Sequence, residues 1–218
     1  MIAFFDMDET LLRVNSATLW VKYQWKNGQI SKREFAKSVG YLLGYKLALV
    51  DVERLALQAA QKLKGLPESD LEAEIRAWYE AEIRHMVEPH MLEIVEKHRN
   101  QGHEIVLLTA STRYVAQALG QDLNIESLIA TRFEVDSGRF TGRLDGGLCW
   151  GHAKVRESLK LAKERRVSLD DCWFYTDSYT DLPMLEAVGH PVVVNPDPRL
   201  QRWATRKRVP IIEHSKQN

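Results

Sequence analysis

The chain has 218 residues, 44% hydrophobic and 28% charged, which is the composition of a folded globular protein rather than of a disordered one. Its 30 basic and 30 acidic side chains cancel, so no overall field favours nucleic acid or an anionic membrane as partner. Two cysteines are too few for a disulfide framework, and the seven histidines lack zinc-ligand spacing. No signal peptide or membrane span is recognisable, so we expect a cytoplasmic protein.

The first predicted element is a short strand, the apolar run at 2–5, which ends in the acidic stretch DMDET. Asp6, Asp8 and Glu9 place three carboxylates at the end of a buried strand, where they repel one another and are costly to desolvate. Asp, Glu and Thr at this point could also begin a helix as cap residues. The arrangement nevertheless favours a bound cation, a nucleophile, or both.

Residues 16–88 are predicted to be helical. In VERLALQAAQKL (52–63) apolar side chains recur at helical spacing, and less regular helices are expected near 16–27 and 31–44. The stretch KGLPESD supplies a turn before a further helix, with Ser69 or Asp70 as its expected N-cap. This segment contains no convincing strand.

After Pro89 short apolar strands alternate with amphipathic helices. Strands are expected in HEIVLLTAS, CWFYTD, PVVVNP and VPII, with a hairpin around an Asp-Ser-Gly turn in LIATRFEVDSGRFTGRLDG. The alternation predicts an α/β fold, a parallel Rossmann-like sheet with helices on both faces. We therefore expect one α/β domain made of residues 1–15 and 89–218, with residues 16–88 inserted as a helical bundle.

In open α/β sheets, ligands bind beyond the carboxyl ends of the strands. Asp6 and Asp8 end the first strand, Thr109-Ala110-Ser111 end the second, and Asp177 ends CWFYT with Asp181 close behind. Carboxylates around a hard cation favour Mg²⁺, which would let one aspartate attack phosphorus as a nucleophile. A hydroxyl, backbone N–H groups and a lysine would then neutralise the phosphoryl charge.

Lys154 is the candidate for that lysine. It follows the glycine-containing stretch GGLCWGHA and stands near the start of a predicted helix. A cation in the first turn of a helix is unfavourable with respect to the helix dipole, although a solvent-facing lysine is the commoner case.

The order Asp6-x-Asp8-x-Thr10, Thr109, Lys154 and Asp177-x-x-x-Asp181 resembles the haloacid dehalogenase-like (HAD) superfamily of hydrolases. The helical insert after the first strand is similar to the type 1 cap of subfamily IB, which includes the phosphoserine phosphatase-type enzymes. The resemblance covers the whole α/β part, and the cap only by position and helicity.

The resemblance implies a role for each matching residue. Asp6 is expected to be the nucleophile and a Mg²⁺ ligand, and Asp8 a general acid and base that binds Mg²⁺ through its backbone carbonyl. Asp177 completes the metal site, Asp181 supports it and orients Lys154, and Thr10 fixes the loop. The expected substrate-binding residues are Thr109, Ala110, Lys154, Thr180 and Asn15.

Four positions depart from the phosphoserine phosphatase pattern. Asn15 replaces a Glu and Thr180 an Asn, both of which contact substrate in that subgroup, while Ala110 and Thr176 replace glycines. The core chemistry is retained, but the groups that recognise an amino acid are missing. We therefore expect a Mg²⁺-dependent phosphomonoesterase acting on a small organic phosphate: a phosphoserine-like amino-acid phosphate, histidinol phosphate or a lipid phosphate.

Three alternatives to a phosphomonoesterase are considered. A phospho-accepting receiver module combines similar residues, but it is shorter, has no cap and lacks an acid at the position of Asp8. A catalytically idle binding protein on the same fold would be expected to lose one of the four motifs, and none is lost. A dinucleotide enzyme is the weakest alternative, since no GxGxxG follows the first strand. Oligomeric state is not indicated.

Overall fold

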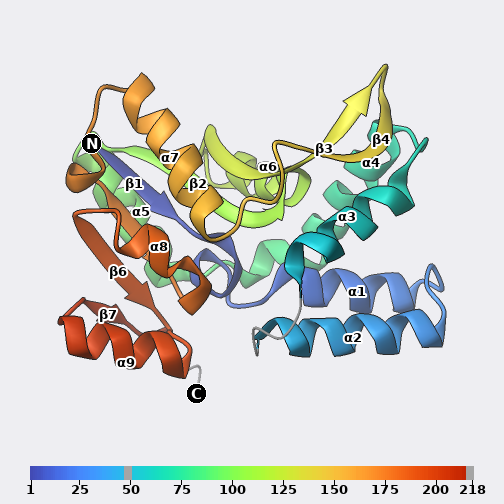
Figure 1. The fold of residues 1–218 in the computed structure, drawn as a ribbon, viewed down its shortest axis with the longest axis horizontal. Coiled ribbons are helices and arrows are strands. Elements are labelled where there is room, and N and C mark those ends of the chain that lie inside the picture. Colours follow the sequence, from blue (N-terminus) through green and yellow to red (C-terminus); the bar gives the residue numbers. More distant parts are fainter. Residues whose placement is uncertain (47–50, 215–218) are drawn as a thin grey trace.

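The computed structural model describes residues 1–46 and 51–214. Within these ranges seven strands form one sheet in the order β4-β3-β2-β1-β5-β6-β7, parallel except for the pair β3–β4 (Figure 1). The expected α/β class is confirmed. The strands are β1 (Ile2–Phe5), β2 (Glu104–Thr112), β3 (Ser127–Asp136), β4 (Arg139–Asp145), β5 (Trp173–Thr176), β6 (His190–Val194) and β7 (Ile211–Ile212).

The central strand β1 is buried on both faces, which explains its uninterrupted apolar sequence. Ala3 and Phe5 point into one core, and Ile2 and Phe4 into the other, because side chains alternate along a strand. Helices α5 (Pro89–Asn100) and α6 (Arg113–Asp122) cover the first face. Helices α7 (His152–Glu164), α8 (Leu182–Leu185) and α9 (Pro198–Lys207) cover the second.

The segment between β1 and α5 is helical, as predicted. It contains α1 (Ser16–Lys26), α2 (Lys32–Lys46), α3 (Val52–Leu63) and α4 (Glu68–Trp78), followed by short helical turns at Tyr79–Ile83 and Arg84–Met86. Figure 1 shows these helices beyond the carboxyl end of β1 rather than on a face of the sheet. Across the described part of the chain, no helix is long and apolar enough to cross a membrane.

The predicted cap of α4 is wrong. The helix begins at Glu68 with Pro67 as its N-cap, ahead of both Ser69 and Asp70. The N–H of Glu68 donates to the carbonyl of Gly138 at 2.9 Å, so a neighbouring backbone satisfies a group that a side-chain cap would otherwise satisfy.

That neighbouring backbone belongs to the β3–β4 hairpin. Ser137 and Gly138 at its tip both have positive φ, of 50° and 75°, as a two-residue hairpin turn requires. The hairpin extends beyond the sheet and pairs with the turn between α3 and α4. The N–H of Gly65 donates to the carbonyl of Phe140 at 2.8 Å, and the N–H of Phe140 to that of Leu66 at 3.1 Å.

Candidate active site

The acidic loop after β1 continues the parallel pairing of the sheet. The N–H of Asp6 donates to the carbonyl of Tyr175 on β5 at 2.9 Å, which places the Asp6 side chain at the carboxyl edge. The loop then turns sharply: Glu9 adopts a left-handed φ of 53° and its N–H bonds the carbonyl of Val14 at 3.1 Å. A non-glycine residue in this region is uncommon and marks a constrained backbone.

Lys154 joins two carboxylates in the interior. Its ammonium lies 2.8 Å from Oδ1 of Asp6 and 2.7 Å from Oδ2 of Asp181, and the residue is only 2% exposed. The hydroxyl of Thr176 donates to the same oxygen of Asp181 at 2.7 Å. Burial alone would lower the pKa of Lys154, but Asp181 and Asp6 together raise it, so the lysine is held charged.

The position of Lys154 depends on the turn before α7. Gly151 is the N-cap residue, with φ 54° and ψ −123°, a conformation that glycine adopts without steric cost. Lys154 follows in the first turn of α7. The ion pairs with Asp6 and Asp181 therefore offset both its desolvation and its unfavourable place in the helix dipole.

The pKa of Asp6 is raised. Burial raises its pKa to about 7; Lys154 opposes this rise, while Asp181 and Asp8 add to it by repulsion. A bound cation beside this carboxylate would favour the ionised, nucleophilic form.

Asp8 is held by three hydrogen bonds. The backbone N–H of Ser16 donates to Oδ1 at 2.8 Å, while the hydroxyls of Ser16 and Ser111 donate to Oδ2 at 3.0 and 2.9 Å. Burial raises the pKa of Asp8, and the bonds from Ser16 and Ser111 oppose that rise. Asp8 is thereby connected to the first helix of the inserted segment and to β2.

Asp177 follows β5 at the same edge. The hydroxyl of Thr10 donates to its Oδ1 at 3.3 Å. Burial raises the pKa of Asp177 well above its usual range, and repulsion from Asp6 and Glu9 raises it further. After burial, the largest contributions to the pKa shift of Asp177 come from neighbouring negative charges. A cation bound here would offset their repulsion and favour the ionised carboxylate.

The donor set fits Mg²⁺ in chemistry. Across residues 1–46 and 51–214 no group of three or more His, Cys, Asp or Glu side chains is arranged around a common point. The expected set needs only two carboxylates, those of Asp6 and Asp177, and the backbone carbonyl of Asp8. All are hard oxygen donors, and Mg²⁺ commonly completes its shell with water and substrate oxygens.

The end of β2 supplies the next part of the site. Thr109 is 1% exposed, and its hydroxyl oxygen accepts the N–H of Ser111 at 3.1 Å. The carbonyl of Ala110 accepts the hydroxyl of Thr131 at 2.7 Å, which anchors the turn to β3. Ser111 therefore links the end of β2 to Asp8 through its hydroxyl.

The two remaining expected residues make local contacts. Asn15 caps α1: its amide oxygen accepts the N–H and the hydroxyl of Thr18, each at 3.0 Å. The hydroxyl of Thr180 lies 2.9 Å from that of Ser178 in the turn between Asp177 and Asp181. Their roles toward substrate stay predictions.

Sequence reasoning did not identify the part played by Ser16 and Thr176. Ser16 stands eight positions after Asp8, so its contact depends on how the intervening loop folds back. Thr176 directly precedes Asp177 and entered the argument only as a departure from the family pattern. For Thr176 the sequence did contain a signal, because a hydroxyl side chain at the end of a strand, just before an acidic turn, can donate to a carboxylate of that turn.

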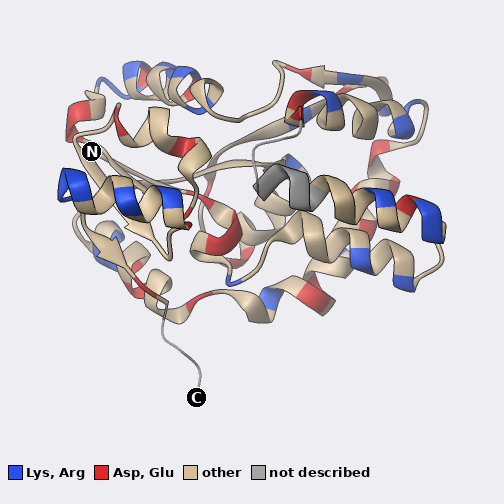
Figure 2. Ribbon diagram, turned by 60° about the horizontal axis from the view of Figure 1, so that its bottom comes forward, with Lys and Arg blue, Asp and Glu red and all other residues tan. Residues whose placement is uncertain are grey.

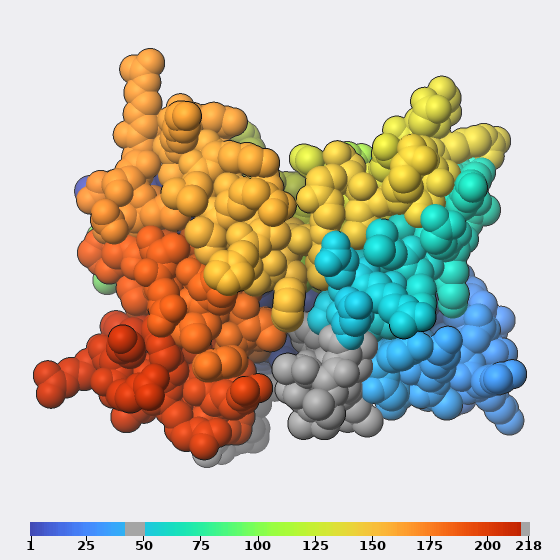
Figure 3. All heavy atoms as spheres, viewed as in Figure 1, coloured from blue at the N-terminus to red at the C-terminus, as the bar shows by residue number. Residues whose placement is uncertain are grey.

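Figure 3 shows that the molecule is hollowed between the segment that leads into α7 and the start of α3, with atoms of the N-terminal segment visible inside the hollow. The sheet thus presents the acid–lysine pair at its carboxyl edge, where open α/β proteins bind their ligands.

Comparison with known proteins identifies the family. The family model described as haloacid dehalogenase-like hydrolase matches residues 3–186. The chain therefore belongs to the haloacid dehalogenase-like hydrolases. This confirms the family expected from the sequence and the expectation of a phosphatase.

Related proteins cover nearly the whole chain. It is 30% identical to a phosphoserine phosphatase of Mycobacterium tuberculosis over 94% of this chain and 68% of that one. It is 26% identical to a histidinol-phosphatase of Neisseria meningitidis over 97% of both chains. The crystal structure of a protein of unknown function from Bordetella pertussis has a TM-score of 0.87 and is 27% identical over 97% of each chain.

Proposed function

We propose that the protein is a magnesium-dependent phosphomonoesterase that hydrolyses a small organic phosphate through an aspartyl-phosphate on Asp6. The observation that carries this proposal is the buried contact of 2.8 Å between Lys154 and Asp6 at the carboxyl edge of the sheet. An ammonium held there can offset negative charge on both the nucleophile and the transferring phosphoryl group.

In the first step a carboxylate oxygen of Asp6 forms a bond to phosphorus while the bond from phosphorus to the ester oxygen breaks. Asp8 gives a proton to that leaving oxygen, which departs as an alcohol. In the second step Asp8 takes a proton from water, the water oxygen bonds to phosphorus, and the bond to Asp6 breaks. Inorganic phosphate leaves and both aspartates return to their starting forms.

The other residues position these groups. Lys154, Thr109 and the backbone near Ala110 would hold the phosphoryl oxygens, while Asp181 keeps Lys154 in place through its 2.7 Å contact. Asp6, Asp177 and the carbonyl of Asp8 would hold Mg²⁺. The ion would supply charge neutralisation among the carboxylates and polarise a phosphoryl oxygen.

Residues 16–88 act in this proposal as a cap on a core of residues 1–15 and 89–218. The hydrogen bonds between Ser16 and Asp8 support this role, because they join the start of the helical segment to the proposed proton donor. Asn15 and Thr180 lie at the two edges of this junction and are proposed to contact the organic part of the substrate.

The proposed substrate is a small phosphorylated molecule handled in the cytoplasm. The relatives named phosphoserine phosphatase and histidinol-phosphatase support amino-acid phosphates and histidinol phosphate as the first classes to test. Lipid phosphates form the third class.

The test is phosphate release from a panel of phosphomonoesters of these three classes, with and without Mg²⁺, for the wild type and Asp6→Asn. The matched control is Asp170→Asn, which makes the same change at an exposed aspartate. We expect release that needs Mg²⁺, is lost in Asp6→Asn and is unchanged in Asp170→Asn.

Wild-type activity that persists in Asp6→Asn or in excess chelator would contradict the mechanism. Retention of ³²P on acid-quenched wild-type protein, and its absence from Asp6→Asn, would identify the covalent intermediate independently of turnover. Failure to trap label from a substrate that the protein hydrolyses would contradict that intermediate.

A further inference from the structure

Helix α9 carries a concentration of positive charge that the proposed reaction does not use. The stretch PRLQRWATRKRVPII, residues 198–212, is rich in arginine and lysine and contains no acid, within a chain of net charge zero. Figure 2 shows this charge gathered along α9. Arg206 and Lys207 in the last turn are favourable with respect to the helix dipole, but Arg199 in the first turn is not.

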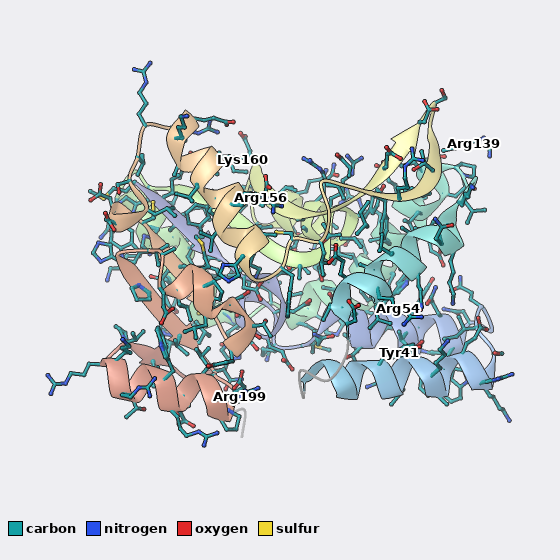
Figure 4. All side chains as sticks on the ribbon, in the orientation of Figure 1. Tyr41, Arg54, Arg139, Arg156, Lys160 and Arg199 are labelled. Atoms are coloured by element: carbon teal, nitrogen blue, oxygen red, sulfur yellow. The ribbon has the colours of Figure 1, made fainter. Side chains whose placement is uncertain are left out.

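Three of these arginines share one side of the helix. Arg199, Arg202 and Arg206 recur at spacings of three and four, which brings them to one face together with Trp203. With Tyr179 from the turn after β5, these four residues line a pocket of about 220 Å³. In Figure 4 Arg199 lies at the end of α9 nearest the centre of the molecule.

The side chains that line the pocket are held by contacts within α9 and with Tyr179. The guanidinium of Arg199 lies 4.9 Å from the ring centre of Tyr179, and Nε of Arg202 donates to the carbonyl of Pro198 at 3.0 Å. Trp203 is 6% exposed, and its indole N–H has no hydrogen-bond partner within the described residues. Trp203 also belongs to the hydrophobic core beneath α9, so its ring forms the floor from which the arginines project.

The acidic side chain nearest to this face along the chain, Asp197, accepts from the backbone of Tyr179, Arg199 and Leu200. In the part of the chain that the structure describes, none of Arg199, Arg202 and Arg206 forms an ion pair, and the lining of the pocket includes no Asp or Glu. The arginines elsewhere on the surface, such as Arg165 on Glu104 and Arg84 on Asp122, are mostly paired.

We propose that this α9 pocket, formed by Tyr179, Arg199, Arg202, Trp203 and Arg206, is a second anion site that takes the phosphate group of a small phosphorylated molecule. Guanidinium groups match the geometry of phosphate oxygens and remain charged at every physiological pH. The pocket is smaller than the usual 300–1,000 Å³ or so of sites for drug-sized ligands, which favours one or two phosphoryl groups over a large molecule.

The pocket adjoins the acidic turn of the active site. The N–H of Tyr179 donates to the carboxylate of Asp197 at 2.8 Å, and the N–H of Asp197 donates to the carbonyl of Asp177 at 3.1 Å. Asp197 also caps α9 by accepting from Leu200 and Arg199. An anion bound to Arg199 would thus lie against the turn that carries Asp177 and Asp181, outside the site that holds Lys154.

The test is calorimetric titration of the full chain with pyrophosphate at low ionic strength in EDTA, so that no metal draws the anion to the active site. Wild type is compared with Arg202→Gln/Arg206→Gln, in which two exposed side chains are changed. The matched control, Arg156→Gln/Lys160→Gln, removes the same charge from the exposed face of α7 (Figure 4). We expect at least tenfold weaker binding in the first variant and less than a twofold change in the control.

A second readout follows the indole N–H of Trp203 in ¹H–¹⁵N spectra during the same titration. Its signal is expected to move in wild type and to stay in place in Arg202→Gln/Arg206→Gln. If that variant fails to fold, Arg199→Gln replaces it in both measurements, with the same expected loss.

Three results would overturn the proposal: no pyrophosphate binding to wild type, equal binding in the arginine variant, or a Trp203 signal that ignores the anion. Sedimentation with vesicles of phosphatidylglycerol and phosphatidylcholine distinguishes the source of the phosphate. Binding to vesicles without binding to free pyrophosphate would overturn the small-molecule site in favour of a lipid surface. Neither readout depends on activity, so the proposed phosphatase could fail its own test while this site stands.

Discussion

Ser16 donates to Asp8 twice, through its backbone N–H at 2.8 Å and its hydroxyl at 3.0 Å. The two donors contact different oxygens of the carboxylate, so they fix its rotation as well as its place. Since Ser16 is the first residue of α1, the proposed proton donor and the start of the helical segment move together.

The first prediction is that Ser16→Ala lowers kcat about tenfold on an alkyl phosphate. One hydrogen bond to a charged group contributes about 1.5 kcal/mol, and its loss leaves the Asp8 carboxylate less well oriented. The loss should be much smaller on p-nitrophenyl phosphate, whose leaving group departs without a proton. Steady-state rates on the two substrates measure the difference.

The control for this variant is Ser168→Ala, an exposed serine that caps a remote turn. It should leave both rates unchanged. An equal loss on both substrates in Ser16→Ala would show that Ser16 supports the fold rather than proton transfer.

The second prediction concerns the buried charges. Lys154→Met should lower the free energy of unfolding by about 3–5 kcal/mol, because it leaves Asp6 and Asp181 buried without a cation. Urea denaturation at pH 7 followed by circular dichroism measures this, with Lys163→Met as the exposed control on the same helix.

Adding Asp181→Asn to Lys154→Met should recover part of that stability, since it removes one of the two repelling carboxylates. A double variant as unstable as the sum of the single variants would contradict the electrostatic account.

The third prediction concerns the proposed metal. Burial raises the pKa of Asp177, so at neutral pH the ionised form destabilises the metal-free fold. Asp177→Asn should therefore raise the melting temperature in EDTA and abolish the further rise that Mg²⁺ produces in wild type. Thermal unfolding at 0 and 10 mM Mg²⁺ tests both effects; a Mg²⁺-dependent rise retained in Asp177→Asn would place the ion elsewhere.

The fourth prediction concerns acid. His98 is 5% exposed and its Nε2 lies 2.8 Å from the hydroxyl of Tyr175; burial, aided by His103 and Lys97, lowers its pKa to about 4. Below pH 6.5 or so the unfolded chain binds a proton there that the folded protein does not. Taken alone, this histidine should thus lower the stability by about 2–3 kcal/mol as the pH drops from 6.5 to 4, opposite in sign to the protonation of the buried aspartates.

The difference in stability between wild type and His98→Gln should therefore change by that amount over the pH range, whereas the difference between wild type and His90→Gln, at an exposed helix position, should stay constant. The measurement is the urea midpoint at half-unit steps of pH. Parallel curves for wild type and His98→Gln would contradict the assignment of this pH dependence to His98.

The residues at the strand ends were predictable because parallel strands bring their carboxyl ends to one edge. Asp6 and Asp177 each follow an apolar run, and Asp181 stands four residues after Asp177, so pattern and chain order located these three, while Lys154, after a glycine turn, needed the match to a family. The match of these motifs to one family then supplied their expected roles.

Other features depend on contacts that no local pattern contains. The bonds from Ser16 to Asp8 depend on a loop that folds back over eight residues. The cap of α4 could not be predicted because its acceptor, the carbonyl of Gly138, comes from a distant hairpin. The basic stretch of α9 was visible, but the pocket requires Tyr179 from another part of the chain.

The pairing of the β3–β4 hairpin with the turn before α4 has a mechanical consequence. The helical segment is tethered not only where the chain enters and leaves it, near 15 and 88, but also where Gly65 and Leu66 bond Phe140. A body fastened at three separated points cannot swing about a single hinge. Movement of the whole helical segment away from the sheet would break the hydrogen bonds to Phe140, whereas bending between α2 and α3 would leave them intact.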